Sequence, residues 1–191
     1  MPPANPENEG QGHLVHSREV HDGRVIQVAV DRVELPNGRT VDLDMVRHPG
    51  AAAIVPFISQ DDILMVRQYR WAVGGFIYEI PAGKLDAGNE DPLLCARREL
   101  EEEVGQRAGR WHPLGPIVTA PGFTDEVIHL YLATELTPGK QELEADEILQ
   151  VERVPFTTAL DWALSGRITD AKTLCGLLRA DLLRRRPVEG S

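Results

Sequence analysis

The stretch Arg97–Gly105, RRELEEEVG, closes a predicted helix with a run of carboxylates. Glu99, Glu102 and Glu103 are three or four residues apart and share one helix face, whereas Glu101 points elsewhere and is expected to be solvated. Like charges at this spacing repel, and acids near a helix C-terminus oppose its dipole. A solvated acidic face is the simplest explanation. We favour a bound divalent cation, because clustered carboxylate oxygens suit Mg²⁺ or Mn²⁺.

The sequence around this stretch sets the limits of the helix. We predict a helix over Pro92–Val104, with Asp91 as its N-cap and Gly105 at the left-handed terminating position. The glycine-rich loop before the helix carries Glu90, eight residues ahead of Arg98. An ion pair between these two side chains would fix the loop. Arg98 is therefore expected to anchor the loop and not to neutralise the acidic residues.

Taken together, these residues resemble the conserved box of the Nudix hydrolases. The positions that carry the resemblance are Gly83, Glu90, Arg98, Glu99, Leu100, Glu102, Glu103 and Gly105. Six residues separate Gly83 from Glu90 where the family has five, and Gln106 stands where the family has an apolar residue. All the charged positions keep their mutual spacing, so neither departure removes an expected metal ligand.

The resemblance implies a Mg²⁺-dependent hydrolase of nucleoside diphosphates linked to another group, with Mn²⁺ as a substitute. In this family the carboxylates that match Glu99, Glu102 and Glu103 hold the metals, and a backbone carbonyl at the position of Ala82 commonly adds a ligand. Metal-bound water is then the expected nucleophile at phosphorus.

Three flanking stretches, VRQYR, YEIPAG and APGFTDEVIHLYLA, are similar to the ADP-ribose pyrophosphatase branch of the family. With them the resemblance covers about residues 20 to 180. It implies hydrolysis of ADP-ribose to AMP and ribose 5-phosphate. Two alternatives stay open: another substrate, such as GDP-mannose, a dinucleoside polyphosphate or an oxidised nucleotide, and a non-catalytic ADP-ribose sensor.

The same flanks supply candidate substrate ligands. Arg67 and Arg70 lie an odd number of residues apart on a predicted strand, so they should point to opposite faces. The resemblance favours Arg70 as the diphosphate ligand, and Arg67 is either a second ligand or part of a surface ion pair. Glu79 either faces the cleft or is the buried partner of an arginine. Thr124 and Glu126 either meet the distal ribose or cap a turn.

A general base should come from outside the metal cluster, because a metal-held carboxylate is a weak base. In this branch a late acidic loop typically supplies it, and KQELEADEILQV is that loop here. Glu147 is the first choice, Glu144 the second and Asp146 the third, although each could instead be a solvated loop residue. A box carboxylate such as Glu102, acting close to the metal, is the competing mechanism.

Composition narrows the class of protein. The chain has 191 residues, a hydrophobic share of 42% and a formal net charge of −10. Such a charge argues against nucleic acid or an anionic membrane as partner. Two cysteines make neither a disulfide framework nor a zinc site. With no signal peptide or membrane-length apolar run in the sequence, a cytoplasmic protein is expected.

The order of predicted elements indicates an α+β fold, an α/β/α sandwich with a mixed central sheet. We expect a disordered tail at 1–15, an antiparallel β region at 16–47 with a PNG turn, and a catalytic domain at 48–186. The branch usually forms homodimers that exchange this N-terminal region, and a lone hairpin needs something to pack on.

Overall fold

The computed structural model describes residues 10–86 and 90–186. The chain divides into two units. One comprises the chain up to Gly50 together with Val118–Val127, and the other comprises Ala51–Ile117 and the chain from Ile128 onward.

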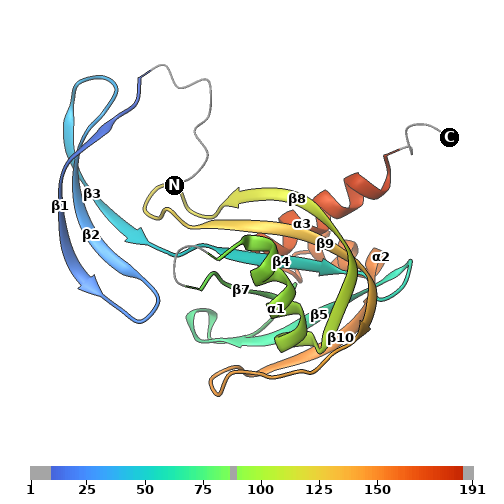
Figure 1. Cartoon of the computed structure of the whole chain (residues 1–191). Coiled ribbons are helices and arrows are strands. Elements are labelled where there is room, and N and C mark those ends of the chain that lie inside the picture. The colour runs from blue at the N-terminus through green and yellow to red at the C-terminus, as the bar shows by residue number, and fades with distance from the viewer. Residues whose placement is uncertain (1–9, 87–89, 187–191) are drawn as a thin grey trace. The chain divides into compact units, whose positions relative to one another are not determined.

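The first unit is built on an antiparallel sheet with the strand order β1-β2-β3 (Figure 1). Its strands are β1 (His13–Asp22), β2 (Gln27–Glu34) and β3 (Thr40–Arg47). The PNG stretch forms the expected turn between β2 and β3, with Gly38 at a φ of 77°. Strand β1 begins three residues before the expected start of the β region at residue 16, so residues 13–15 lie in the sheet and not in the tail. Residues 1–9 of that tail lie outside the described part.

The second unit contains two sheets. Their strands are β4 (Ala51–Pro56), β5 (Asp62–Arg70), β6 (Gly75–Glu79), β7 (Ala82–Lys84), β8 (Gln106–Val118), β9 (Val127–Pro138) and β10 (Leu149–Pro155). One sheet has the order β7-β4-β9-β8 and is mixed, because β4 runs parallel to β9 and antiparallel to β7. The other has the order β10-β5-β6 and is antiparallel. A short 3₁₀ turn, η1 (Trp71–Val73), joins β5 to β6.

In the described residues, three helices complete this unit: α1 (Pro92–Val104), α2 (Phe156–Leu164) and α3 (Ala171–Arg184). The helix predicted over Pro92–Val104 agrees with the bounds of α1. Among the described residues, none of the helices has the length and apolarity needed to cross a membrane.

Strand β4 shows how the layers pack, because all six of its residues are buried. Such an unbroken apolar run is typical of a strand covered on both faces. Its odd-numbered residues pack in one apolar cluster with Leu177 and Ala180 of α3, and Ala52 and Ile54 pack in another with Leu100 of α1. The mixed sheet therefore lies between helices, and the predicted α/β/α arrangement is confirmed.

Candidate active site

The local sequence sets both ends of helix α1. The Asp91 carboxylate accepts hydrogen bonds from the amides of Leu93 and Leu94 at 2.8 and 3.2 Å. Gly105 takes the left-handed conformation, with φ 67°, which ends the helix. The buried face of α1 contains Cys95, Ala96, Glu99, Leu100, Glu103 and Val104. Two of the acidic residues thus lie on the apolar side of the helix.

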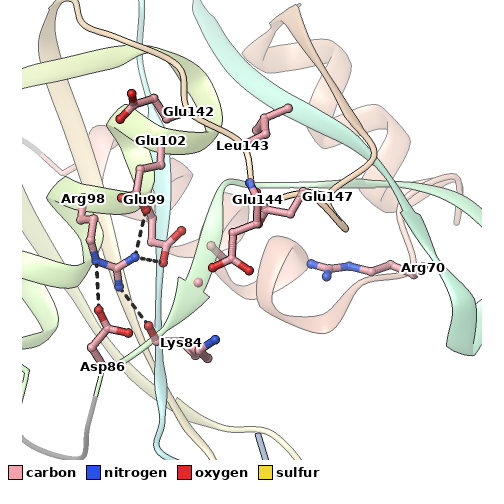
Figure 2. A pocket seen from close by; sticks show the side chains of 12 residues that line it. Arg70, Lys84, Asp86, Arg98, Glu99, Glu102, Glu142, Leu143, Glu144 and Glu147 are labelled. Carbon is pink, nitrogen blue, oxygen red and sulfur yellow. Dashed lines mark hydrogen bonds and ion pairs between the residues drawn. The ribbon is translucent and has the colours of Figure 1, made fainter. Parts of the chain in front are cut away.

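A cleft of about 290 Å³ opens beside this helix (Figure 2). Its lining residues come from β5, β7, the loop after β7, α1 and the loop before β10: Arg70, Ala82, Gly83, Lys84, Asp86, Arg98, Glu99, Glu102, Glu142, Leu143, Glu144 and Glu147. Six of these carry carboxylates and three carry basic groups. An anionic substrate would enter such a cleft only with added positive charge, which bound cations supply.

Burial shifts the ionisation of the two inner carboxylates. Glu99 and Glu103 expose only 7% and 2% of their surface. Desolvation raises the pKa of Glu99 to about 7, although Arg98 opposes the rise. Desolvation also raises the pKa of Glu103 to about 8, and the charges of Glu99 and Glu147 add to it. Both groups would ionise more readily beside a cation.

The corner between Ala82 and Gly83 lies directly against these acids. The amide of Ala82 donates to Glu103 Oε2 at 2.9 Å. A Cβ atom on Gly83 would lie 2.0 Å from the carboxyl carbon of Glu99, so a glycine is required for this close approach. The structure thus brings the expected ligand residues Ala82, Glu99 and Glu103 together, despite the extra loop residue.

Arg98 has a wider role than the sequence predicted. It anchors the loop as expected, through Glu90 at 3.2 Å and the carbonyl oxygen of Lys84 at 3.2 Å. Burial opposes ionisation of Glu90, but the bonds from Arg98 hold the pKa of that carboxyl below its usual value. Arg98 Nη1 also donates to Glu99 at 2.6 Å and to Glu102 at 3.0 Å. The expectation that Arg98 does not neutralise the acidic run is therefore wrong.

Glu101 was expected to be only solvated, and this too needs correction. It points away from the cleft, as helical spacing predicted, but it has specific partners. Arg107 lies 2.7 Å from one of its oxygens, and the amide of Lys140 donates to it at 3.3 Å. Glu101 therefore helps to hold the chain that follows β9 against the end of α1.

Glu99, Glu102, Glu103 and the carbonyl group of Ala82 offer oxygen ligands, which a hard divalent cation prefers. Burial suppresses the ionisation of Glu99 and Glu103, and a bound cation would favour their charged forms. Within residues 10–86 and 90–186, however, no three acidic, histidine or cysteine side chains are already arranged as a metal site. The guanidinium of Arg98 bonds to oxygens of Glu99 and Glu102 that a metal would use. Metal binding would have to displace it from them.

The late acidic loop is held at the C-terminal end of α1 by its backbone. The Gly139 amide donates to the carbonyl oxygen of Gly105 at 2.9 Å, and the Glu142 amide donates to the carbonyl oxygen of Glu102 at 3.0 Å. The Gln141 side chain donates to the carbonyl oxygen of Glu103 at 2.7 Å. These bonds satisfy helix carbonyls that lack partners within α1. They also bring an acidic segment about 40 residues away in sequence to the cleft.

Two of the candidate bases in this loop, Glu144 and Glu147, line the cleft. The Glu147 carboxylate accepts from the amide of Glu144 at 2.8 Å, and the Glu147 amide donates to the carbonyl oxygen of Glu144 at 3.1 Å. This turn fixes the position of Glu147. Asp146 is not among the lining residues. Glu142 is, and it was missed although it lies within the predicted acidic loop.

Arg70 lines the cleft, whereas Arg67 does not. Arg70 bonds to the buried Glu79, with Nη2 and Nε lying 2.8 and 3.0 Å from the same oxygen. The guanidinium of Arg67 stacks on the ring of Phe76 at 4.5 Å. The structure thus places Glu79 as the buried partner of an arginine, one of the two alternatives. Sequence reasoning missed its second partner, Lys172, at 2.8 Å.

Thr124 and Glu126 belong to the first unit, where they form part of a turn. The Thr124 hydroxyl accepts from the amide of Glu126 at 3.2 Å. Thr119 donates to Glu126 at 2.8 Å, and His48 lies 3.4 Å from the same carboxylate. These contacts show the turn-capping role. Contact with a ribose stays a prediction.

Comparison with known proteins places the chain in a family. Residues 46–175 match the NUDIX domain, and residues 13–43 match the nucleoside diphosphate sugar hydrolase N-terminal domain. A solved structure described as "Crystal structure of ADP compounds hydrolase" has the same fold, with a TM-score of 0.78 at 23% identity. The match covers 91% of this chain and 94% of that one.

Curated relatives agree with this assignment. The ADP-ribose pyrophosphatase of Bacillus subtilis (strain 168) is 41% identical over 83% of this chain and 86% of its own. The ADP-ribose pyrophosphatase of Mycobacterium tuberculosis is 39% identical over 86% and 80%, respectively. The methanol dehydrogenase activator of Bacillus methanolicus is 42% identical over 84% and 87%. These matches show that the chain belongs to the NUDIX domain family.

Proposed function

We propose that this protein hydrolyses the diphosphate bond of ADP-ribose or a related nucleoside diphosphate sugar, giving a nucleoside monophosphate and a sugar phosphate. The observation that carries the proposal is the cleft, in which the acidic face of α1, Arg70 and the acidic loop line one cavity. Relatives about 40% identical over most of their length are named ADP-ribose pyrophosphatases, which supports this substrate class.

We assign metal binding to Glu99, Glu102, Glu103 and the carbonyl oxygen of Ala82, with Mg²⁺ as the cofactor and Mn²⁺ as a substitute. When bound, the cation neutralises the diphosphate and provides an activated water molecule. The chain's own contribution is a ligand set of which two carboxylates are buried. Burial of Glu99 and Glu103 excludes water, and the Ala82 amide fixes the Glu103 carboxylate.

Glu147 is the proposed general base, with Glu144 as the second candidate. Both carboxylates line the cleft outside the proposed metal ligands, and the turn between them holds Glu147 in place. A carboxylate held in this way accepts the proton of the attacking water. Glu102, acting close to the metal, remains the competing choice, since it also lines the cleft.

Arg70 is the proposed ligand of the diphosphate. Its guanidinium reaches the cleft on the opposite side of Glu144 and Glu147 from α1 in the view of Figure 2, and its donors suit phosphate oxygens. Arg67 has its guanidinium on Phe76, and we give it the lesser role in binding. We keep Thr124 and Glu126 as proposed ligands of the distal ribose.

A substrate panel tests the proposal. ADP-ribose, ADP-glucose, GDP-mannose, NADH and diadenosine polyphosphates are incubated with the full chain in Mg²⁺ or Mn²⁺, and products are separated by ion-exchange chromatography. We expect the highest kcat/KM for ADP-ribose or another nucleoside diphosphate sugar, and none in EDTA. Preference for a dinucleoside polyphosphate, or turnover in EDTA, would contradict the proposal.

We further propose a homodimer in which the β1–β3 sheet of each chain packs on its partner. In support, every residue of β1 is exposed, including Leu14, Val15 and Val20. Exposed apolar side chains gathered on one strand are typical of a surface that packs on another chain. Sedimentation at micromolar concentration should give a dimer mass, and a monomer would exclude exchange.

The proposal includes a cytoplasmic location. It rests on the two cysteines, Cys95 and Cys175, which are both free thiols in the structure. Burial raises the pKa of Cys95 to about 12, so that thiol stays protonated and unreactive. Free thiols are typical of proteins in a reducing compartment. Cell fractionation with detection of the full chain checks this assignment, and recovery in a secreted fraction would refute it.

A further inference from the structure

Lys172 is a basic residue in an unfavourable place. It lies in the first turn of α3, where the helix dipole disfavours a positive charge. Its side chain is only 12% exposed, and Nζ lies 2.8 Å from Glu79 Oε1 and 3.0 Å from Asp170 Oδ1. A buried lysine at a helix N-terminus is costly unless its charge is paired, and the carboxylates of Glu79 and Asp170 pair it here.

Glu79 connects Lys172 to the cleft. The side chain of Glu79 is 3% exposed, and its two oxygens serve different cations. Oε1 accepts from Lys172, and Oε2 accepts from Nε of Arg70 at 3.0 Å. Arg70, by contrast, is 39% exposed and lines the cleft. The three side chains thus form a line from the start of α3 to the substrate side.

The far end of this line is rigidly mounted. Asp170 caps α3 by accepting from the amide and hydroxyl of Thr173 at 2.9 and 2.6 Å. The Thr173 hydroxyl accepts in turn from the amide of Ile80 at 2.9 Å, and Thr173 is fully buried. Because Ile80 directly follows Glu79, the same helix end fixes both the backbone and the carboxylate at this point.

We propose that Lys172 is a positioning residue, which holds Glu79 so that Arg70 presents its guanidinium to the anionic substrate. This inference rests on the proposed function, since it takes Arg70 as a diphosphate ligand. Lys172 lies 102 positions after Arg70 in the sequence and does not line the cleft, so it would contribute to substrate binding indirectly.

The test compares Lys172→Met with Lys172→Arg, and with Arg185→Met, which removes a cation from the C-cap of α3. Arg185 pairs only with Asp181 among the contacts described and is 72% exposed. With ADP-ribose, Lys172→Met should raise KM about tenfold with kcat nearly unchanged, because a charge-assisted contact that binds ground and transition states alike is weakened. Lys172→Arg should restore most of the affinity.

A double-mutant cycle separates positioning from general loss of structure. In an Arg70→Ala background, Lys172→Met should change kcat/KM no further, since it acts through Arg70. Additive losses in the cycle, or an unchanged KM in Lys172→Met, would overturn the inference.

A readout independent of turnover distinguishes failure of this inference from failure of the proposed function. In ¹⁵N-labelled protein, the Nε–H signal of Arg70 should exchange with solvent faster in Lys172→Met than in wild type, and normally in Lys172→Arg. An unchanged signal overturns the inference even if the enzyme hydrolyses ADP-ribose. Absence of hydrolysis of the whole panel by wild type refutes the proposed function instead.

Discussion

Arg98 Nη1 lies 2.6 Å from Glu99 Oε1, so adjacent residues of one helix form an ion pair at the cleft. Arg98 also bonds to Glu90 of the preceding loop and to Glu102 one turn later. This arrangement answers the puzzle posed by RRELEEEVG. Without a metal, the acidic run is partly neutralised from within its own helix, and the same cation holds the loop.

Glu103→Gln should abolish metal-dependent turnover and leave the fold intact. The substitution keeps an oxygen to accept from the Ala82 amide but removes the charge that a cation requires. We expect kcat to fall by at least about a hundredfold, with an unchanged or higher Tm in EDTA because an amide avoids the cost of ionising a buried carboxylate. Steady-state kinetics and thermal unfolding measure both effects.

Glu101→Gln is the matched control for that variant, because Glu101 points away from the cleft and pairs with Arg107. It should keep nearly all activity. Normal activity in Glu103→Gln, or equal losses in both variants, would contradict the assignment of Glu103 as a ligand.

Arg98→Met should destabilise the metal-free protein by about 1–3 kcal/mol, since several half-buried carboxylates lose a shared partner. Urea unfolding in EDTA measures the change. Arg107→Met, which removes an exposed guanidinium paired with Glu101, should change stability much less. An equal effect of the two variants would refute the role given to Arg98.

The sequence predicted those features that depend on neighbours within one helical turn. Asp91, Gly105 and the shared face of Glu99 and Glu103 follow from helix geometry, and all appear as expected.

Features that depend on distant segments could not be predicted in this way. The bond from Gln141 to the end of α1 and the pairing of Lys172 with Glu79 join residues 38 and 93 positions apart. No local pattern specifies such partners, because they follow from the packing of sheets and helices. Lys172 did carry one signal, a positive charge at a helix N-terminus, which mirrors the acids at the C-terminus of α1.

In EDTA, the stability of the protein should fall as pH rises from about 5 to about 8. Burial raises the folded-state pKa of Glu99 to about 7 and that of Glu103 to about 8, above the ordinary value of 4.5. In this window the folded state binds more protons than the unfolded state, so unfolding becomes easier as pH increases. Thermal unfolding at several pH values measures the slope.

Saturating Mg²⁺ should flatten this pH dependence, because a bound cation keeps both carboxylates ionised in the folded state. Glu103→Gln should reduce the slope in EDTA, which separates the contribution of Glu103 from that of histidines. A Tm that does not vary with pH in EDTA would show that these carboxylates are not suppressed as described.

Glu147→Gln should lower kcat by about 10²–10⁴-fold with little change in KM, as expected when a general base is removed. The amide oxygen of the new side chain still accepts from Glu144, so the turn is kept. Glu144→Gln is the comparison, because the Glu144 side chain lines the same cleft but takes no part in this hydrogen bond. A larger loss in Glu144→Gln would move the base there, and mild losses in both would favour Glu102.

Gly83→Ala should remove most activity while changing stability little. A Cβ atom at this position would lie 2.0 Å from the carboxyl carbon and one oxygen of Glu99. The clash involves the end of a flexible side chain, so Glu99 can move aside without disturbing the backbone. The displaced carboxylate would no longer lie beside the Ala82–Gly83 corner, and metal affinity should fall.

Gly75→Ala is the control, since its added Cβ meets nothing within 4 Å. Calorimetric titration with Mn²⁺ and unfolding in EDTA distinguish the two effects. If Gly83→Ala bound Mn²⁺ as tightly as Gly75→Ala, the close approach of Glu99 to this corner would have no part in metal binding.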